Sequence, residues 1–192
     1  MVVPGSIQGP PADFLAAVDE VRGVPLRSEV IAEEMPAPQR IAPHAYAMTG
    51  DVVVDDDELA TGRFILLHDP KGNDAWNGTY RCVTFARADI ETEMAVDPML
   101  PAVGWSWLTD ALDHHQAAYR EASGSVTIVH SESFGEMTDN GSSAQIEVRA
   151  SWTPESTKGA HAAAWADLLC MLAGLPPLTA GVTPLPNRRG QR

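Results

Sequence analysis

Four strand-like runs follow one another between residues 29 and 88, separated by turn signals but by no helical pattern. Closely spaced strands pair with their neighbours in an antiparallel meander, because parallel strands need a long crossover between them. The expected strands cover residues 29–35, 44–54, 59–68 and 79–88. This feature restricts the chain to folds that are built on an antiparallel sheet.

Helical patterns flank the meander, and two further strands follow it. We expect helices at residues 10–22, near residues 90–97, at 106–122 and at 157–173, and strands at 125–130 and 144–152. Segregated strands and helices indicate an α+β fold, here a mostly antiparallel sheet of about six strands with helices packed on one face. We expect a single domain at residues 10–175, a flexible N-terminal arm at 1–9 and a Pro-rich extended C-terminal tail at 176–192.

The last expected strand alternates strictly between apolar and polar side chains. Ile146 and Trp152 belong to the apolar set, whereas Glu147 and Arg149 belong to the polar set. This pattern predicts a sheet with one packed face and one wet face. Trp165 belongs to the apolar stripe of the final helix, so we expect Trp152 and Trp165 to be buried in one core cluster.

Charge and hydropathy exclude several classes of protein. The 192-residue chain has 26 acidic and 13 basic side chains and a net charge of −13, which disfavours direct binding of nucleic acid. No stretch approaches the ~20 apolar residues of a membrane helix, and the N-terminus lacks the pattern of a secretory signal. We therefore expect a cytoplasmic protein without membrane contact, in which Cys82 and Cys170 are reduced core thiols.

The motifs do not assemble a complete catalytic site. The segment Gly104-Trp105-Ser106-Trp107-Leu108 begins like a nucleophile elbow, but Leu108 replaces the final glycine and a loop is expected before it. Ser106 is better interpreted as the N-cap of a helix. Glycine-rich phosphate loops are absent from the sequence. Whether the protein is an enzyme is left open.

Three arginines of the expected strands, Arg63, Arg81 and Arg149, are candidates for a ligand-binding site. They are expected on the wet face of the sheet, where guanidinium groups could hold an acidic ligand in bidentate fashion. The alternative is that each arginine forms an ion pair with a neighbour such as Glu147.

Two further sets of residues are weaker candidates. Asp110 and His114 lie four apart on one helix face and could bind a metal with His44, His68 or His130, although an exposed helix pair explains them more simply. We therefore expect no cofactor. Candidate contacts with a protein partner are Trp76, which either folds back onto the sheet or awaits a partner, and Gln39 and Arg40 in a Pro-rich connection.

Several segments of the chain carry a family resemblance. They are Pro36-Ala37-Pro38-Gln39-Arg40-Ile41-Ala42-Pro43, residues 60–70, residues 104–112, residues 131–135 and residues 147–154. In these segments the chain resembles an uncharacterised family of actinobacterial proteins, the domain-of-unknown-function family numbered three thousand, from about residue 12 to residue 178. The resemblance implies no activity or catalytic residue. It implies a gene near a ribonuclease-D-like exonuclease, and hence a link to RNA metabolism.

These observations lead to two functional hypotheses. The first is a non-catalytic cytoplasmic interaction or regulatory protein, linked to RNA metabolism through a protein partner. The alternative is a small-molecule-binding protein or an enzyme that uses the arginine-lined sheet face for an acidic ligand. The sequence does not identify the partner, and it leaves self-association open.

Overall fold

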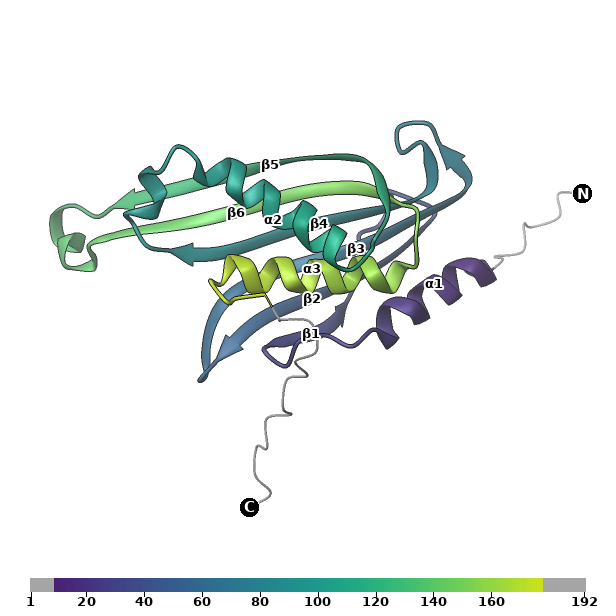
Figure 1. The fold of residues 1–192 in the computed structure, drawn as a ribbon, viewed down its shortest axis with the longest axis horizontal. Coiled ribbons are helices and arrows are strands. Elements are labelled where there is room, and N and C mark those ends of the chain that lie inside the picture. The colour runs from purple at the N-terminus through teal and green to yellow at the C-terminus, as the bar shows by residue number, and fades with distance from the viewer. Residues whose placement is uncertain (1–8, 178–192) are drawn as a thin grey trace, which may run out of the picture.

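The structure is a computed structural model and describes residues 9–177. The expected N-terminal arm, except Gly9, and the expected tail beyond residue 177 lie outside the described residues. Six antiparallel strands form one sheet in the order β1-β2-β3-β4-β6-β5 (Figure 1). The strands are β1 (Val30–Met35), β2 (His44–Val54), β3 (Asp57–Asn73), β4 (Gly78–Ile90), β5 (Tyr119–Glu132) and β6 (Ser142–Pro154). The expected α+β fold is therefore confirmed.

The three α-helices pack together on one face of this sheet (Figure 1). They are α1 (Ala12–Gly23), α2 (Leu100–His114) and α3 (Lys158–Leu172), and two short 3-10 helices cover η1 (Met94–Val96) and η2 (Gly135–Asn140). α3 lies in the middle of the helical layer, between α1 and α2, and it also contacts β2, β3, β4 and β6 of the sheet. This central place explains why α3 is buried on nearly all sides rather than on one stripe.

The core is built around two tryptophans. Trp152 of β6 and Trp165 of α3 are both completely buried, and both contact Phe64 of β3, with ring centroids 6.5 and 5.8 Å away. The prediction of one shared core cluster is confirmed. Two glycines let α3 approach the sheet this closely: a Cβ at Gly50 would lie 2.6 Å from Trp165, and one at Gly62 would lie 2.6 Å from Leu169.

The segment from residue 99 to residue 122 differs most from the structure expected from the sequence. α2 begins at Leu100 and ends at His114, and residues 119–122 already belong to β5. Ser106 is therefore no N-cap; it lies inside α2, and its hydroxyl donates to the carbonyl of Val103 over 2.8 Å. Gln116 has a positive φ of 52°, which ends the helical path.

The other helices and strands lie close to their expected ranges. The expected short helix near residues 90–97 shrinks to η1, because Ile90 still belongs to β4. β3 runs several residues further than expected towards β4, ending at Asn73, and the ladder is irregular between His68 and Asn73. Because the helices cover one face only, the opposite face of the sheet is left uncovered (Figure 1).

Candidate ligand-binding face of the sheet

The uncovered face contains an open hollow of about 450 Å³. Its centre is apolar, formed by Ile65, Val83 and Phe85 on the two middle strands, β3 and β4. Arg63 and Arg149 flank this centre, and serines of β5 and β6 complete the lining. The lining side chains include no aspartate or glutamate among the described residues, so the hollow is locally basic in an acidic protein.

The strand register brings the two arginines into one row. Arg63 pairs with Phe85, Phe85 pairs with Arg149, and Arg149 pairs with Ser125 of β5. Residues that are opposite one another on neighbouring strands project from the same face of a sheet. The row therefore presents two guanidinium groups on either side of one aromatic ring, as the expected wet face suggested.

Arg149 already has two interactions within the chain. Its guanidinium lies 5.1 Å from the centroid of the Phe85 ring and 2.9 Å from the carboxylate of Glu147. The Arg149 side chain is 57% exposed, whereas Glu147 is only 18% exposed, so the guanidinium still presents a free side to solvent. Arg149 thus fits both interpretations that the sequence left open, an ion pair and a ligand contact.

Arg81 lies on the same face as the other two arginines but does not line the hollow. Its side chain is only 7% exposed, and its guanidinium donates to the hydroxyls of Thr153 (3.0 Å), Ser151 (2.8 Å) and Ser123 (3.3 Å). All three partners are neutral, and burial lowers the pKa of Arg81. Ser123 and Ser151 also line the hollow, so Arg81 borders it through these two hydroxyls.

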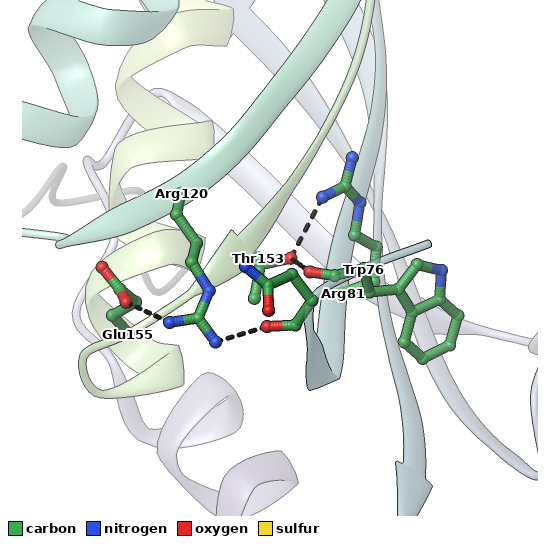
Figure 2. A network of polar contacts seen from close by, with 6 residues as sticks. Trp76, Arg81, Arg120, Thr153 and Glu155 are labelled. Atoms are coloured by element: carbon green, nitrogen blue, oxygen red, sulfur yellow. Dashed lines mark hydrogen bonds and ion pairs between the residues drawn. The ribbon is translucent and has the colours of Figure 1, made fainter. Parts of the chain in front are cut away.

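A polar network next to Arg81 fixes the loop between β3 and β4 (Figure 2). Thr153, which accepts from Arg81, donates its own hydroxyl to the carbonyl of Trp76 over 2.5 Å. Arg120 donates to the carbonyl of Asn77 and lies 2.6 Å from the carboxylate of Glu155. The main chain of the loop is therefore tied to the ends of β5 and β6.

The candidate partner contacts lie at one end of the sheet. Trp76 is half-buried in the loop between β3 and β4, whereas Gln39 and Arg40 are exposed in the connection between β1 and β2. The pairing of His44 with His68 places both connections at the same end of the sheet. This end adjoins Arg81 but is separate from the centre of the hollow.

The candidate metal pair lies on the opposite, helical side of the molecule. Asp110 and His114 are both exposed on α2. None of the three histidines expected to complete this pair reaches it: His44 and His68 contact the ring of Phe14 on α1, and His130 of β5 lies 3.2 Å from Glu132. The structure instead brings His115 and Asp167 of α3 to His114.

A cluster of side chains between α1 and the sheet was not expected from the sequence. His68 is 1% exposed and stacks on Tyr80 with ring centroids 4.1 Å apart, and its Nδ1 donates to the carbonyl of Thr79. Asp13 of α1 lies 3.4 Å from Nε2 of His68, and burial together with Asp13 raises the pKa of Tyr80 to about 12. These contacts join elements far apart in sequence, so no local pattern could have indicated them.

Comparison with known proteins places the chain in a family. The model of a family described as a protein of unknown function, DUF3000, matches residues 10–183. The chain belongs to the DUF3000 family. The DUF3000 match covers every strand and helix of the structure, and with them the uncovered sheet face. No curated protein and no solved structure matches this DUF3000 chain. Within residues 9–177, no helix is long and apolar enough to cross a membrane.

Proposed function

We propose that this domain is a non-catalytic binding module that holds an acidic segment of a protein partner on the uncovered face of its sheet. The observation that carries the proposal is the row of Arg63, Phe85 and Arg149 across three neighbouring strands. The row places one guanidinium group on each side of an aromatic ring. Arginine and aromatic side chains are enriched at the hot spots of protein interfaces.

The charge of the hollow supports an acidic partner. The chain as a whole has a net charge of −13 and repels other acidic molecules at long range. A partner that carries a few carboxylates within an otherwise neutral or basic surface is not repelled, and its carboxylates fit the guanidinium groups.

The shape of the hollow supports a macromolecular segment over a small molecule. Sites for small molecules usually enclose most of the ligand surface. Here the hollow of about 450 Å³ is open to solvent along the sheet, so a small ligand would stay largely exposed. An extended segment gains affinity from several positions along the face, and it does not need an enclosing wall.

The chemistry of the hollow supports binding rather than catalysis. Ser123, Ser125 and Ser151 provide hydroxyls, but the described lining holds no histidine, cysteine or carboxylate that could activate them. The second hypothesis from the sequence, a small-molecule-binding protein or an enzyme acting on an acidic ligand, is therefore the less favoured one.

The cellular setting is part of the same proposal. Cys82 and Cys170 are free and buried, and burial raises the pKa of both thiols, which supports a reducing compartment such as the cytoplasm. The family resemblance in the sequence, with its actinobacterial origin and neighbouring ribonuclease-like gene, suggests a partner from RNA metabolism. The net charge supports contact with such a partner through protein rather than through RNA.

Binding of defined probes tests the proposal. Fluorescent peptides in which glutamate alternates with leucine should bind the parent chain, with an affinity that decreases as salt increases. The double variant Arg63→Gln/Arg149→Gln should bind several-fold more weakly, since each solvent-exposed ion pair is worth about 0.2–1 kcal/mol. Arg87→Gln is the matched control, because Arg87 is exposed on the same strand as Phe85 but does not line the hollow.

Three outcomes would contradict the proposal. Peptide affinity that is unchanged in the double variant would place binding elsewhere. A single-stranded RNA of mixed sequence that binds more tightly than the peptides would replace the protein segment by a nucleic acid. Inorganic phosphate or a dicarboxylate that binds alone and displaces the peptides at low concentration would favour a small-molecule site.

A further inference from the structure

Three metal-ligating side chains meet where the end of α2 packs against α3. They are His114, the last residue of α2, His115, the C-cap of α2, and Asp167 of α3. One ligand atom of each side chain lies within 4.8 Å of the ligand atoms of the other two. Ligand atoms around a tetrahedral zinc ion lie about 3.3 Å apart, given zinc–ligand distances of about 2.0 Å. Small side-chain rotations therefore bring the three atoms to coordination distance.

The fold holds two of these side chains in place. His115 and Asp167 are both half-buried, and Nε2 of His115 donates to the Asp167 carboxylate over 2.7 Å. A metal ion would replace the proton between these two atoms, as metal binding to histidine generally releases a proton. The ring of His114 meets that of His115 edge to face, with centroids 5.1 Å apart, and is exposed enough to turn towards the metal.

A buried arginine beside this cluster gives independent evidence of a ligand. Arg27 is only 8% exposed, and its two terminal nitrogens donate to Glu29 and to the carbonyl of Pro176. Its Nε is buried without a hydrogen-bond partner. Arg27 lines two neighbouring hollows of about 220 and 200 Å³, and His114 and Asp167 line both of them as well. A buried donor without a partner is costly, and an anion in these hollows would remove that cost.

We infer that His114, His115 and Asp167 bind one divalent transition metal ion of the zinc type, whose remaining coordination position faces the hollow beside Arg27 and accepts an anionic oxygen ligand. Two imidazoles and one carboxylate form a ligand set that zinc commonly takes, and a fourth position left to an exogenous ligand is usual for zinc sites outside purely structural ones. This site lies on the helical side of the sheet and is independent of the proposed protein-binding face.

The charges around the site are consistent with a metal together with an anion. Asp167 supplies one negative charge to the metal, and Glu29, 2.9 Å from Arg27, offsets the arginine. The divalent ion and Arg27 would otherwise repel each other, so an anion between them stabilises both. Asp110, which lines the larger hollow with His114, adds a further carboxylate to that hollow.

Zinc titration of the untagged chain, followed by calorimetry, tests the inference with the metal alone as probe. We expect one zinc ion per chain and a higher melting temperature with zinc than without it. His114→Gln, His115→Gln and Asp167→Asn should each weaken zinc binding more than about tenfold. His130→Gln is the matched control, since His130 is an exposed histidine of β5. It pairs with Glu132 on the same strand and is not one of the three proposed ligands. Circular dichroism of each variant shows whether it is folded.

X-ray absorption of the zinc-loaded parent gives a second readout that needs no variant. It should show nitrogen and oxygen neighbours with imidazole scattering and no sulfur. Adding phosphate should change the zinc spectrum of the parent, and this change should be reduced in Arg27→Gln. The inference is overturned by zinc that binds at less than one ion per chain, by equal affinity in the parent and the three ligand variants, or by sulfur at the metal.

Discussion

The indole nitrogen of Trp152 donates a hydrogen bond of 2.9 Å to Nδ1 of His161, and both side chains are completely buried. Because an indole nitrogen can only donate, Nδ1 of His161 must be the unprotonated nitrogen of a neutral ring. The proton is then on Nε2, which donates to the hydroxyl of Ser156 over 3.1 Å. One bond between β6 and α3 thus fixes both the tautomer and the charge of a core histidine.

Truncation of either core tryptophan should strongly destabilise the fold. Trp152→Ala and Trp165→Ala should each lower the free energy of unfolding by about 3–5 kcal/mol, because each removes a fully buried aromatic side chain from the shared cluster. Urea denaturation followed by circular dichroism measures the loss. Trp76→Ala, in the half-buried loop, serves as the control and should cost clearly less. Equal losses at all three positions would show that the cluster is not the centre of the core.

Replacement by phenylalanine should separate the two core tryptophans. Trp152→Phe leaves Nδ1 of His161 without its donor, which costs about 1–3 kcal/mol beyond the change in packing. The indole nitrogen of Trp165 is buried and has no hydrogen-bond partner, so Trp165→Phe removes an unsatisfied donor. We expect the Trp165→Phe protein to be the more stable of the two in urea. The reverse order would mean that the bond to His161 contributes little.

The stability of the fold should depend on pH through His161. Burial, and to a smaller extent Lys158, lowers the pKa of His161 to about 4, whereas an unfolded histidine titrates near 6.5. Between these values the unfolded chain binds a proton that the folded chain does not, so stability falls as the pH is lowered from about 6.5 towards 4. The loss attributable to this group is roughly 3 kcal/mol at most.

Urea denaturation of the parent and of His161→Gln at pH 7, 6 and 5 measures this contribution. Glutamine does not titrate, and its amide oxygen can still accept from Trp152. The parent should lose more stability than the variant between pH 7 and pH 5, a range in which most carboxylates stay ionised. Parallel pH profiles would refute the assignment of a neutral, buried His161.

The sequence predicted the sheet well because its strands are local patterns. The alternation at Ile146 and Trp152 requires only that one face be buried, and the strand is found where that alternation is. The end of α2 was predicted wrongly because Tyr119 and Ala122 continue a helical spacing although they belong to β5. The ladder of β5 is irregular between Arg120 and Ser123, and such a bulge disrupts the alternation that would have marked a strand.

The candidate sites show the same division between local and long-range information. Arg63 and Arg149 were correctly expected on the wet face, since that depends only on alternation within each strand. Their common row with Phe85 depends on the register of three strands, which no local pattern specifies. The meeting of His114 with Asp167 likewise depends on how α2 packs against α3, so the sequence paired His114 with Asp110 and did not indicate His115 or Asp167.

Two glycines under α3 should be intolerant of even one added methyl group. Gly62→Ala places a Cβ 2.6 Å from Leu169 and 2.9 Å from the carbonyl oxygen of Phe85, and Gly50→Ala places one 2.6 Å from Trp165. Such overpacking typically costs about 1–3 kcal/mol. Thermal unfolding should show lower melting temperatures for both variants, whereas Gly23→Ala, where a Cβ meets nothing within 4 Å, should be close to the parent. Melting at the parent temperature would mean that α3 moves away from the sheet at little cost.

Two arginines of β4 should differ in their contribution to stability. Arg81→Ala removes the donor for three hydroxyls and leaves a gap at the end of the sheet, which should cost about 1–3 kcal/mol. Arg87→Ala, on the same strand and face but exposed, should stay within about 0.5 kcal/mol of the parent. Chemical denaturation of both variants tests the contrast. A neutral effect of Arg81→Ala would indicate that its buried charge costs as much as its hydrogen bonds contribute.

The central position of α3 has a consequence for how the chain is synthesised. Within residues 9–177, the segment 158–172 is the last to form a regular element, yet it contacts four strands and both other α-helices. On the ribosome, all six strands emerge before α3, so the apolar surface around Phe64 and Trp152 stays exposed to solvent until residues 158–172 have emerged. Nascent chains that stop before residue 158 would therefore expose this face, and they are the natural targets for chaperones and proteases.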